Sequence, residues 1–415
     1  MEELIEIGKK AKQASRQLAN LNTNRKNKVL LLVADLLEKY SDTILEANAQ
    51  DLELGQEMGL KGAIVDRLTL SGERITGMAE GLREIVQLED PIGEIEEMKK
   101  RPNGLLIGKK RVPLGVVGVI YESRPNVTAD VAGLCIKTGN VCILRGGKEA
   151  FQSNNAIVRI FHEAIESCNL DPNMVQLVQN TNRESAVAMM KLNDYLDILI
   201  PRGGAGLIQA VVQNSTVPVI ETGVGNCHVY VDEDADLEMA VSIVFNAKTH
   251  RPGVCNAAES LLVHEKVAAQ VLPGIGKTLT EGGVEIRGDE TTCRLIPESK
   301  QATEEDWATE YLDLVISSKV VGSLEEAVEH INTYGSMHSE SIITENYSHA
   351  QYFLDRVDAA AVYVNASTRF TDGFEFGYGA EIGISTQKLH ARGPVGLKEL
   401  TTYKWIIFGS GQVRA

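Results

Sequence analysis

Short apolar runs alternate with helix-like stretches along most of this chain, and this alternation limits the folds that it can adopt. Five such runs lie in its middle part, at residues 116–121, 141–145, 175–178, 196–200 and 217–220. Helix-like stretches such as 153–167 and 184–192 separate them. Continuous apolar strands that alternate with helices are typical of βαβ units, in which helices cover both faces of a parallel sheet. The sequence therefore predicts an α/β fold.

The flanking regions extend this pattern. The first ninety residues carry apolar side chains at helical spacing, for example at Leu18, Val29 and Val33, and predict a helical segment. After Glu221 the alternation restarts, and we expect strands of a second α/β unit at 229–231, 261–264, 314–321, 342–344 and 361–364. A length of 415 residues predicts two or three domains.

Two smaller segments stand apart from both α/β units. Residues 94–106 contain Asn103-Gly104, a strong hairpin signal, and residues 401–408 near the C-terminus are strand-like. A two-stranded hairpin is only marginally stable alone, so it needs another edge to pair with. We expect a neighbouring subunit to supply that edge, which predicts at least a homodimer.

Composition excludes several classes of function. A net charge of −16 repels phosphate backbones and argues against nucleic-acid binding. The sequence starts Met1-Glu2-Glu3, the wrong charge for a signal peptide, and its longest apolar stretch is too short for a membrane span. The six cysteines show no CxxC spacing, so we expect a reducing, cytoplasmic compartment and no metal site.

Cys255 is the candidate nucleophile. It follows a Pro252-Gly253 turn and the cations Lys248 and Arg251, and a helix that started at Cys255 would add backbone N–H groups. Such settings lower a thiol pKa from about 8.5 to roughly 3.5–7.5. The local sequence supports a small buried hydrophobe equally well, since most free cysteines are that. Cys227 is the rival nucleophile, because it precedes a histidine.

Two strand ends carry the residue types of an anion site. The run at 141–145 leads into Arg145-Gly-Gly-Lys148, and the run at 196–200 ends in Arg202-Gly203-Gly204 before a helix. Ligands of open parallel sheets bind at such strand ends, and helix N-termini attract phosphate. The pattern predicts a dinucleotide, and Arg145 with Lys148 would favour NADP(H) over NAD. The alternative is a pair of solvated cations on a loop.

Four segments, at 118–126, 137–150, 221–228 and around Cys255, together resemble the aldehyde dehydrogenase superfamily over nearly the whole chain. More narrowly, they resemble its family of γ-glutamyl phosphate reductases, or glutamate-5-semialdehyde dehydrogenases. The resemblance implies a Rossmann-type dinucleotide-binding domain (1–92 and 112–226) and an α/β catalytic domain (227–396). It also implies a small β oligomerisation arm (93–111 and 397–415).

The same resemblance implies an activity. NADPH would reduce L-glutamate 5-phosphate to L-glutamate 5-semialdehyde and phosphate through a Cys thioester, a reaction of proline biosynthesis. One alternative is a hydrolytic NAD(P)-dependent aldehyde dehydrogenase. Another is a non-catalytic member of the fold, which the combination of Cys255, Glu221 and Arg145 argues against.

Roles for individual residues follow from the resemblance. It makes Cys255 the nucleophile and Glu221 the general base, and it places Arg145 at the adenosine ribose or its phosphate. The 201–204 turn would lie against the pyrophosphate, Glu310 would hold the nicotinamide ribose, and Asn126 would stabilise the oxyanion. For the leaving phosphate the candidates are Arg124, His228, Lys248 and Arg251. His228 has a second interpretation as a hydrogen-bonded core residue, and Arg369 is the candidate for the substrate's α-carboxylate.

Overall fold

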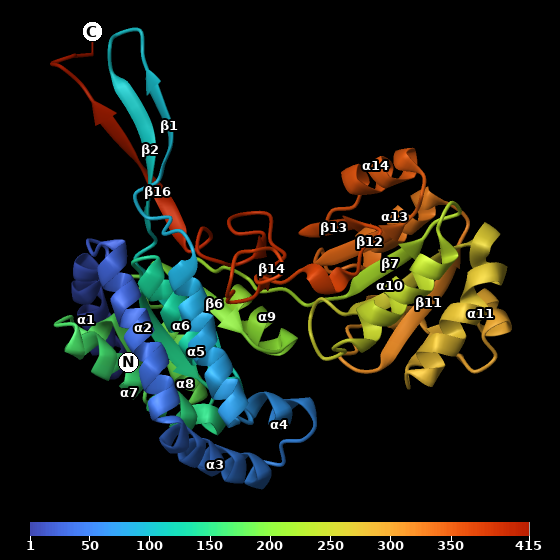
Figure 1. The fold of residues 1–415 in the computed structure, drawn as a ribbon, viewed down its shortest axis with the longest axis horizontal. Coiled ribbons are helices and arrows are strands. Elements are labelled where there is room, and N and C mark those ends of the chain that lie inside the picture. Colours follow the sequence, from blue (N-terminus) through green and yellow to red (C-terminus); the bar gives the residue numbers. More distant parts are fainter. Residues whose placement is uncertain (415) are drawn as a thin grey trace. The chain divides into compact units, whose positions relative to one another are not determined.

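The computed structural model describes residues 1–414 and divides the chain into two compact units (Figure 1). Unit 1 comprises Met1–Thr222, Gly377–Gly383 and the residues from Val395 onward. Unit 2 comprises Gly223–Phe376 and Ile384–Pro394. Both segments of the expected arm fall within unit 1, and the chain first passes from unit 1 to unit 2 after Thr222.

Unit 1 begins with helices, as the apolar spacing predicted. They are α1 (Glu2–Leu18), α2 (Thr23–Lys39), α3 (Ser41–Glu57), α4 (Ala63–Leu68) and α5 (Gly72–Gln87). Side-chain caps define two of the starts, since Asn22 accepts a hydrogen bond from the Arg25 N–H and Ser71 accepts one from Arg74. None of the helices in the described part of the chain is long and apolar enough to cross a membrane.

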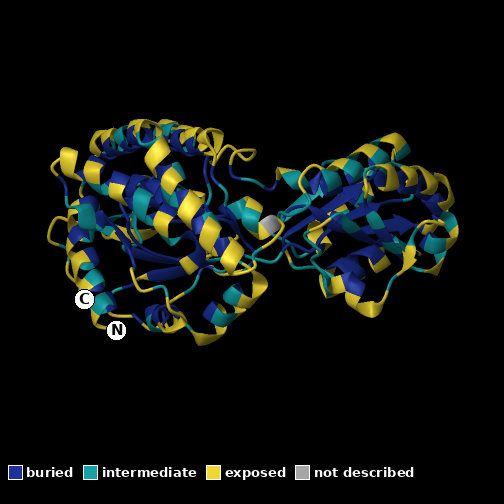
Figure 2. Cartoon of the chain, turned by 90° about the horizontal axis from the view of Figure 1, so that it is seen from below, coloured by how far each residue is buried: buried dark blue, intermediate teal, exposed yellow. Residues whose placement is uncertain are grey.

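A four-stranded parallel sheet forms the centre of unit 1. Its strands are β3 (Val116–Tyr121), β4 (Val141–Gly146), β5 (Val175–Leu177) and β6 (Ile198–Arg202), in the order β5-β4-β3-β6. The connecting helices are α6 (Pro125–Lys137), η1 (Lys148–Ala150), α7 (Phe151–Ser167), η2 (Pro172–Met174) and α8 (Arg183–Met189), and α9 (Ala205–Asn214) follows β6. Every residue of β3 and β4 is buried, which requires cover on both faces (Figure 2).

The expected strand at 217–220 is wrong. Residues there form only an isolated bridge, in which Val219 pairs with Leu199 of β6. Two hydrogen bonds form this bridge, from the Leu199 N–H to the Pro218 carbonyl and from the Ile220 N–H to the Leu199 carbonyl, and Pro218 has no N–H with which to pair with a further strand.

The predicted hairpin is confirmed. Strands β1 (Ile95–Lys100) and β2 (Leu106–Pro113) pair antiparallel, and β16 (Thr401–Phe408) completes a three-stranded sheet in the order β1-β2-β16. Gly104 closes the turn with φ +90°, a conformation that favours glycine, and its N–H donates to the Arg101 carbonyl. Most of β16 is exposed, including Trp405, Ile407 and Phe408.

Unit 2 is built on a seven-stranded parallel sheet. In the order β10-β9-β11-β8-β7-β12-β13, its strands are Lys300–Gln301, Glu285–Gly288, Val315–Val321, Ala258–His264, Cys227–Val231, Ser339–Ile343 and Ala361–Val364. The helices are α10 (Leu237–Thr249), α11 (Glu265–Glu281), α12 (Glu290–Leu295), η3 (Glu304–Ala308), α13 (Leu324–Tyr334), α14 (Tyr347–Arg356) and η4 (Thr368–Phe370). The short strands β14 (Ile384–Ser385) and β15 (Gly393–Pro394) pair separately. The sequence patterns missed β9 and β10.

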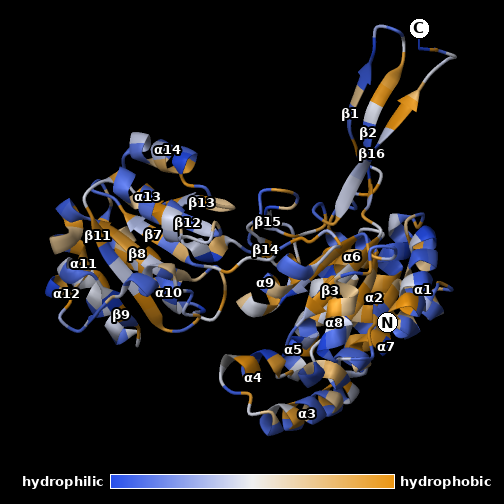
Figure 3. Cartoon of the chain, turned by 180° about the vertical axis from the view of Figure 1, so that it is seen from behind, coloured by the Kyte–Doolittle hydropathy of each residue, from blue (hydrophilic) through white to orange (hydrophobic). Residues whose placement is uncertain are grey.

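Side chains of β7 alternate between two hydrophobic clusters, one on each face of this sheet. Val229 and Val231 pack in the cluster that includes α10 and α11, whereas Tyr230 packs with Phe353 in the cluster of α13 and α14. Figure 3 shows orange, hydrophobic strands inside each unit, whereas the exposed β1 is largely blue. The structure therefore confirms the predicted α/β class.

Candidate active site

Cys255 lies on the turn that joins α10 to β8. Asp236 caps the start of α10 by accepting the N–H groups of Glu238 and Met239 at 3.0 and 2.9 Å. The helix ends at Thr249 and β8 begins at Ala258, so no helix starts at Cys255 to add the N–H groups that the sequence left open. The Cys255 residue is only partly buried. Cys255 is therefore held on a short turn between two regular elements, α10 and β8.

The segment that enters β7 packs tightly against this turn. A Cβ placed on Gly225 would lie 1.6 Å from the Cys255 carbonyl oxygen, so only glycine fits there. The Gly225 N–H donates to Glu310 Oε1 at 2.7 Å, and the Cys227 thiol donates to the Cys255 carbonyl at 3.2 Å. Glu310, the predicted partner of the nicotinamide ribose, therefore also fixes the backbone beside the nucleophile.

Lys248 does not supply positive charge to a ligand, contrary to its place among the phosphate candidates. Its Nζ lies 2.6 Å from Glu259 Oε2, and neither side chain is exposed. Glu259 also accepts the Leu312 N–H at 3.2 Å. Burial lowers the pKa of Lys248 and raises the pKa of Glu259 to about 7. The pair is an internal structural contact beneath the nucleophile turn.

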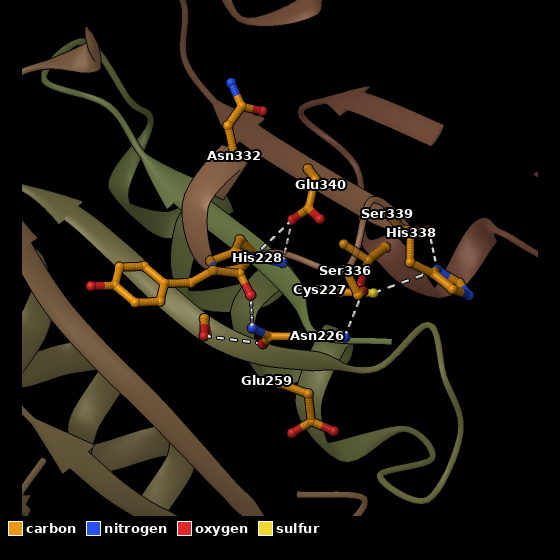
Figure 4. Close-up of polar contacts among 12 residues, drawn as sticks. Asn226, Cys227, His228, Glu259, Asn332, Ser336, His338, Ser339 and Glu340 are labelled. Atoms are coloured by element: carbon orange, nitrogen blue, oxygen red, sulfur yellow. Dashed lines mark hydrogen bonds and ion pairs between the residues drawn. The ribbon is translucent and has the colours of Figure 1, made fainter. Parts of the chain in front are cut away.

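His228 is a core residue, so its predicted role in binding substrate is wrong. Its ring is fully buried, and its Nδ1 and backbone N–H lie 3.0 and 2.7 Å from the same oxygen of Glu340, as Figure 4 shows. The rival nucleophile Cys227 is also fully buried, and its sulfur lies 3.6 Å from His338 Nδ1. Burial raises the pKa of the Cys227 thiol well above its usual range. The burial of Cys227 and its raised pKa both favour Cys255 over Cys227 as the nucleophile.

Arg251 and Arg369 bring positive charge to the nucleophile turn. Arg251 is exposed on the turn itself, and Arg369 lies in η4 with a buried Nε that has no hydrogen-bond partner among residues 1–414. Burial lowers the pKa of Arg369, the charge of Arg251 lowers it further, and Asp372 and the Cys255 thiolate raise it. Arg369 therefore interacts electrostatically with both Arg251 and Cys255, an arrangement suited to an anionic substrate.

A cavity of about 900 Å³ lies in unit 1 at the carboxyl ends of β3, β4 and β6. Four predicted cofactor residues line it, namely Arg145, Lys148, Gly203 and Gly204, and so does Arg124. Arg202, the last residue of β6, is not among the lining residues. The chain passes from β3 through β4 to β5 on one side and places β6 on the other, and ligands bind where the strand order reverses in this way.

Arg67 and Arg183 also line this cavity and were missed by the sequence analysis. Arg183 opens α8, directly after the loop that leaves β5, so the rule that ligands meet strand ends contained the signal. Arg67 comes from α4, far away in sequence, and no local pattern places it there.

Arg145 holds the loop that follows β5. Its Nη2 lies 2.5 Å from the Thr181 carbonyl oxygen and 2.9 Å from that of Asn182, and its Nε is 3.5 Å from Ser185 Oγ. The side chain is only 9% exposed, and burial lowers its pKa. Lys148 is exposed on the same wall and is the more accessible cation of the predicted pair.

Two carboxylates accept hydrogen bonds from backbone N–H groups at the cavity edge. Glu122 Oε2 accepts the Gly204 N–H at 3.0 Å, at the turn expected to hold the pyrophosphate. Glu149 Oε1 accepts both the N–H and the hydroxyl of Ser123 at 2.8 Å, and Ser123 has a φ of +43°. The 201–204 turn thus lies at the cavity edge, and its Gly204 N–H is bonded to the Glu122 carboxylate.

The remaining predicted residues belong to unit 1. Asn126 is exposed on the first turn of α6, where its Nδ2 donates to Asp130 Oδ2 at 3.1 Å. Burial raises the pKa of Asp130 to about 6. Glu221 is partly buried just before the end of the unit. The roles of Asn126 and Glu221 toward the nucleophile stay predictions.

Known proteins match the chain closely. The aldehyde dehydrogenase family matches residues 1–293. The gamma-glutamyl phosphate reductase of Carboxydothermus hydrogenoformans is 61% identical over 414 residues, which cover 100% of both chains. The crystal structure of gamma-glutamyl phosphate reductase from Thermotoga maritima has a TM-score of 0.97 and 52% identity, and covers 100% of both chains. An engineered glycolyl-CoA reductase with bound NADP+ has a TM-score of 0.70 at 16% identity, covering 97% of this chain and 95% of its own.

Proposed function

The chain belongs to the aldehyde dehydrogenase family, and on that premise we propose that it reduces L-glutamate 5-phosphate to L-glutamate 5-semialdehyde and phosphate, a reaction of proline biosynthesis. The proposal rests on relatives named for this reaction that are about 60% identical over the whole chain. In the molecule, one observation carries it: the accessible Cys255 lies beside the guanidinium groups of Arg251 and Arg369.

The chain's residues account for the acyl transfer. The Cys255 thiolate attacks the acyl carbon, and the bond from that carbon to the phosphate oxygen breaks. Inorganic phosphate departs, and the acyl group remains on Cys255 as a thioester. We assign the leaving phosphate to Arg251, which is exposed on the nucleophile turn, and to Arg124. The Cys255 N–H and Asn126 are the proposed donors to the oxyanion, and the loss of one such donor lowers a rate by about 10²–10³.

The cavity of unit 1 fits a dinucleotide. It combines a volume of about 900 Å³ with the cations Lys148 and Arg183 and with Gly203, where a Cβ would lie 2.4 Å from Glu122. Members of this family use a nicotinamide cofactor, and NADPH, when bound, supplies the hydride that reduces the thioester. We assign the 2′-phosphate to Lys148 supported by Arg145. The pyrophosphate goes to Gly203 and Gly204, which line the cavity, and Glu310 receives the nicotinamide ribose.

One assay tests the proposal, with glutamate-5-semialdehyde and NADP⁺ as substrates and inorganic phosphate varied from zero. We expect a rate that depends on phosphate and a Cys255→Ser variant with an unchanged fold and less than a few per cent of the activity. A rate that does not change with the phosphate concentration would favour the hydrolytic alternative, in which Glu221 activates water. Turnover retained by Cys255→Ser would exclude the thioester mechanism.

We also propose that the enzyme is a cytoplasmic homodimer or larger homo-oligomer that assembles through the β1-β2-β16 sheet. The support is the exposed apolar surface of β16, which includes Trp405, Ile407 and Phe408. Light scattering should show more than one chain per particle, and Trp405→Lys should lower that number. A monomeric wild type would exclude this assembly.

A further inference from the structure

Asn256, the residue directly after the nucleophile, connects the Cys255 turn to the η4 segment. Its Nδ2 donates to the Thr371 carbonyl at 2.9 Å and to the Arg369 carbonyl at 3.3 Å. In return, the Thr368 hydroxyl donates to the Asn256 carbonyl at 2.7 Å. Asn256 is 5% exposed and Thr368 is fully buried, so water does not compete well for these bonds. Three hydrogen bonds thus hold the backbone that carries Arg369.

The far end of the same segment is anchored to the sheet. Thr371 Oγ1 lies 2.6 Å from Ser339 Oγ on β12 and 2.7 Å from the Tyr363 hydroxyl on β13. The Ser367 hydroxyl accepts the Arg369 N–H at 3.3 Å. The Arg369 backbone therefore has little freedom, and only the end of its side chain can adjust to a ligand.

The charges in this region make these hydrogen bonds of Asn256, Thr368 and Thr371 necessary, and we call them the clamp. Burial lowers the pKa of Arg369 and the like charge of Arg251 lowers it further, so an unrestrained loop would move the second guanidinium away from the first. Bidentate binding of a carboxylate demands a fixed guanidinium plane. Side chains that bind substrate need support from neighbours that lock their position.

We propose that Asn256 is a positioning residue that holds the Arg369 guanidinium beside Cys255, where Arg369 binds the α-carboxylate of the glutamyl substrate. This inference rests on the proposed function, because it requires an amino-acid substrate with a free α-carboxylate. Asn256 acts through Arg369 and takes no part in the bond changes at the sulfur.

Steady-state kinetics with glutamate-5-semialdehyde, NADP⁺ and phosphate test the inference. Asn256→Ala should raise the KM for the semialdehyde about tenfold to a hundredfold, the range expected when a charge-assisted hydrogen bond is lost. The KM for phosphate and the kcat should change less than about threefold. Arg369→Ala should raise the KM for the semialdehyde at least as much. In the double variant, Asn256→Ala should add nothing to Arg369→Ala, because the group that it positions is gone.

Three further measurements separate positioning from a general loss of structure. Thr368→Val removes one bond of the clamp at nearly constant volume and should give a smaller rise in the same KM. Asn346→Ala is the matched control, since Asn346 caps α14 through the N–H groups of Ser348 and His349, away from the nucleophile turn. It should lower the melting temperature and leave KM unchanged. The rate of Cys255 alkylation by iodoacetamide should differ less than about threefold between Asn256→Ala and wild type.

Specific results would overturn the inference. An unchanged KM for the semialdehyde in folded Asn256→Ala, or in Arg369→Ala, is incompatible with it. So is a double variant whose KM rises by the product of the two single effects, because independent effects mean that Asn256 does not act through Arg369. A wild type without phosphate-dependent turnover would instead refute the proposed function, so the two failures are distinguishable.

Discussion

Replacing Gly225 with alanine should displace the backbone of Cys255, although Cys255 itself is not substituted. A Cβ at residue 225 would lie 1.6 Å from the Cys255 carbonyl oxygen, 2.4 Å from its carbonyl carbon and 2.6 Å from its Cα. All three are backbone atoms, so no side-chain rotation relieves the overlap. The φ of Gly225 is not in the left-handed region, and the effect of alanine is therefore steric.

The size of the effect follows from the same distances. Real Cβ atoms essentially never approach within 3.0 Å, so the two backbones must separate by about 1.4 Å. A misplacement of about 1 Å lowers an enzymatic rate about a hundredfold, so we expect kcat/KM to fall by at least that factor. Overpacking of this kind destabilises a protein by about 1–3 kcal/mol, which a stable fold tolerates.

The assay compares kcat/KM and the melting temperature of Gly225→Ala with those of Gly274→Ala. Gly274 is exposed in α11, and a Cβ there would meet only Val241 at an ordinary 3.7 Å. We expect the control to keep its activity and to gain up to about 1 kcal/mol from the better helix propensity of alanine. A Gly225→Ala enzyme with more than a third of the wild-type kcat/KM would refute the reasoning, because the turn would then not depend on this contact.

Three other predictions follow from buried or loop-holding charges. Lys148→Ala should weaken the binding of NADP⁺ about tenfold more than the binding of NAD⁺ in calorimetric titrations. Arg145→Ala should weaken the binding of both, because the 181–182 loop is released. Equal losses of affinity in Lys148→Ala would show that Lys148 does not bind the 2′-phosphate. Lys248→Met should lower the free energy of unfolding by about 3–5 kcal/mol in urea titrations, because Glu259 is left buried without its partner, and Glu259→Leu in the same chain should restore most of it. Burial lowers the pKa of His330 to about 3, so below pH 6.5 only the unfolded chain takes up this proton and stability falls. Between pH 8 and pH 5 the free energy of unfolding of His330→Phe should therefore fall by about 2 kcal/mol less than that of wild type. Identical pH profiles of unfolding free energy for the two proteins would contradict the lowered pKa.

Local patterns in the sequence determined the class of the fold. Apolar runs of strand length located β3, β4, β7 and β13, and Asn103-Gly104 located the hairpin, because strand burial and turn geometry depend on residues close together in the chain. The Pro-Gly turn placed Cys255 on an open loop for the same reason. Glycines and cations at two strand ends located part of the cavity wall, because parallel strands bring their carboxyl ends to one edge.

Tertiary structure decided which polar residues are available for chemistry. His228 meets Glu340 because β7 and β12 are neighbours in the sheet, although 112 residues separate them in the chain. Lys248 meets Glu259 because the turn after α10 folds back into β8, and both pairs removed candidates that the sequence could not distinguish from surface cations. The contacts of Gly225 with Cys255 and of Asn256 with Arg369 also arise only when distant segments pack. Periodicity records which face of an element is buried, but the partner of a buried charge depends on the order of the strands.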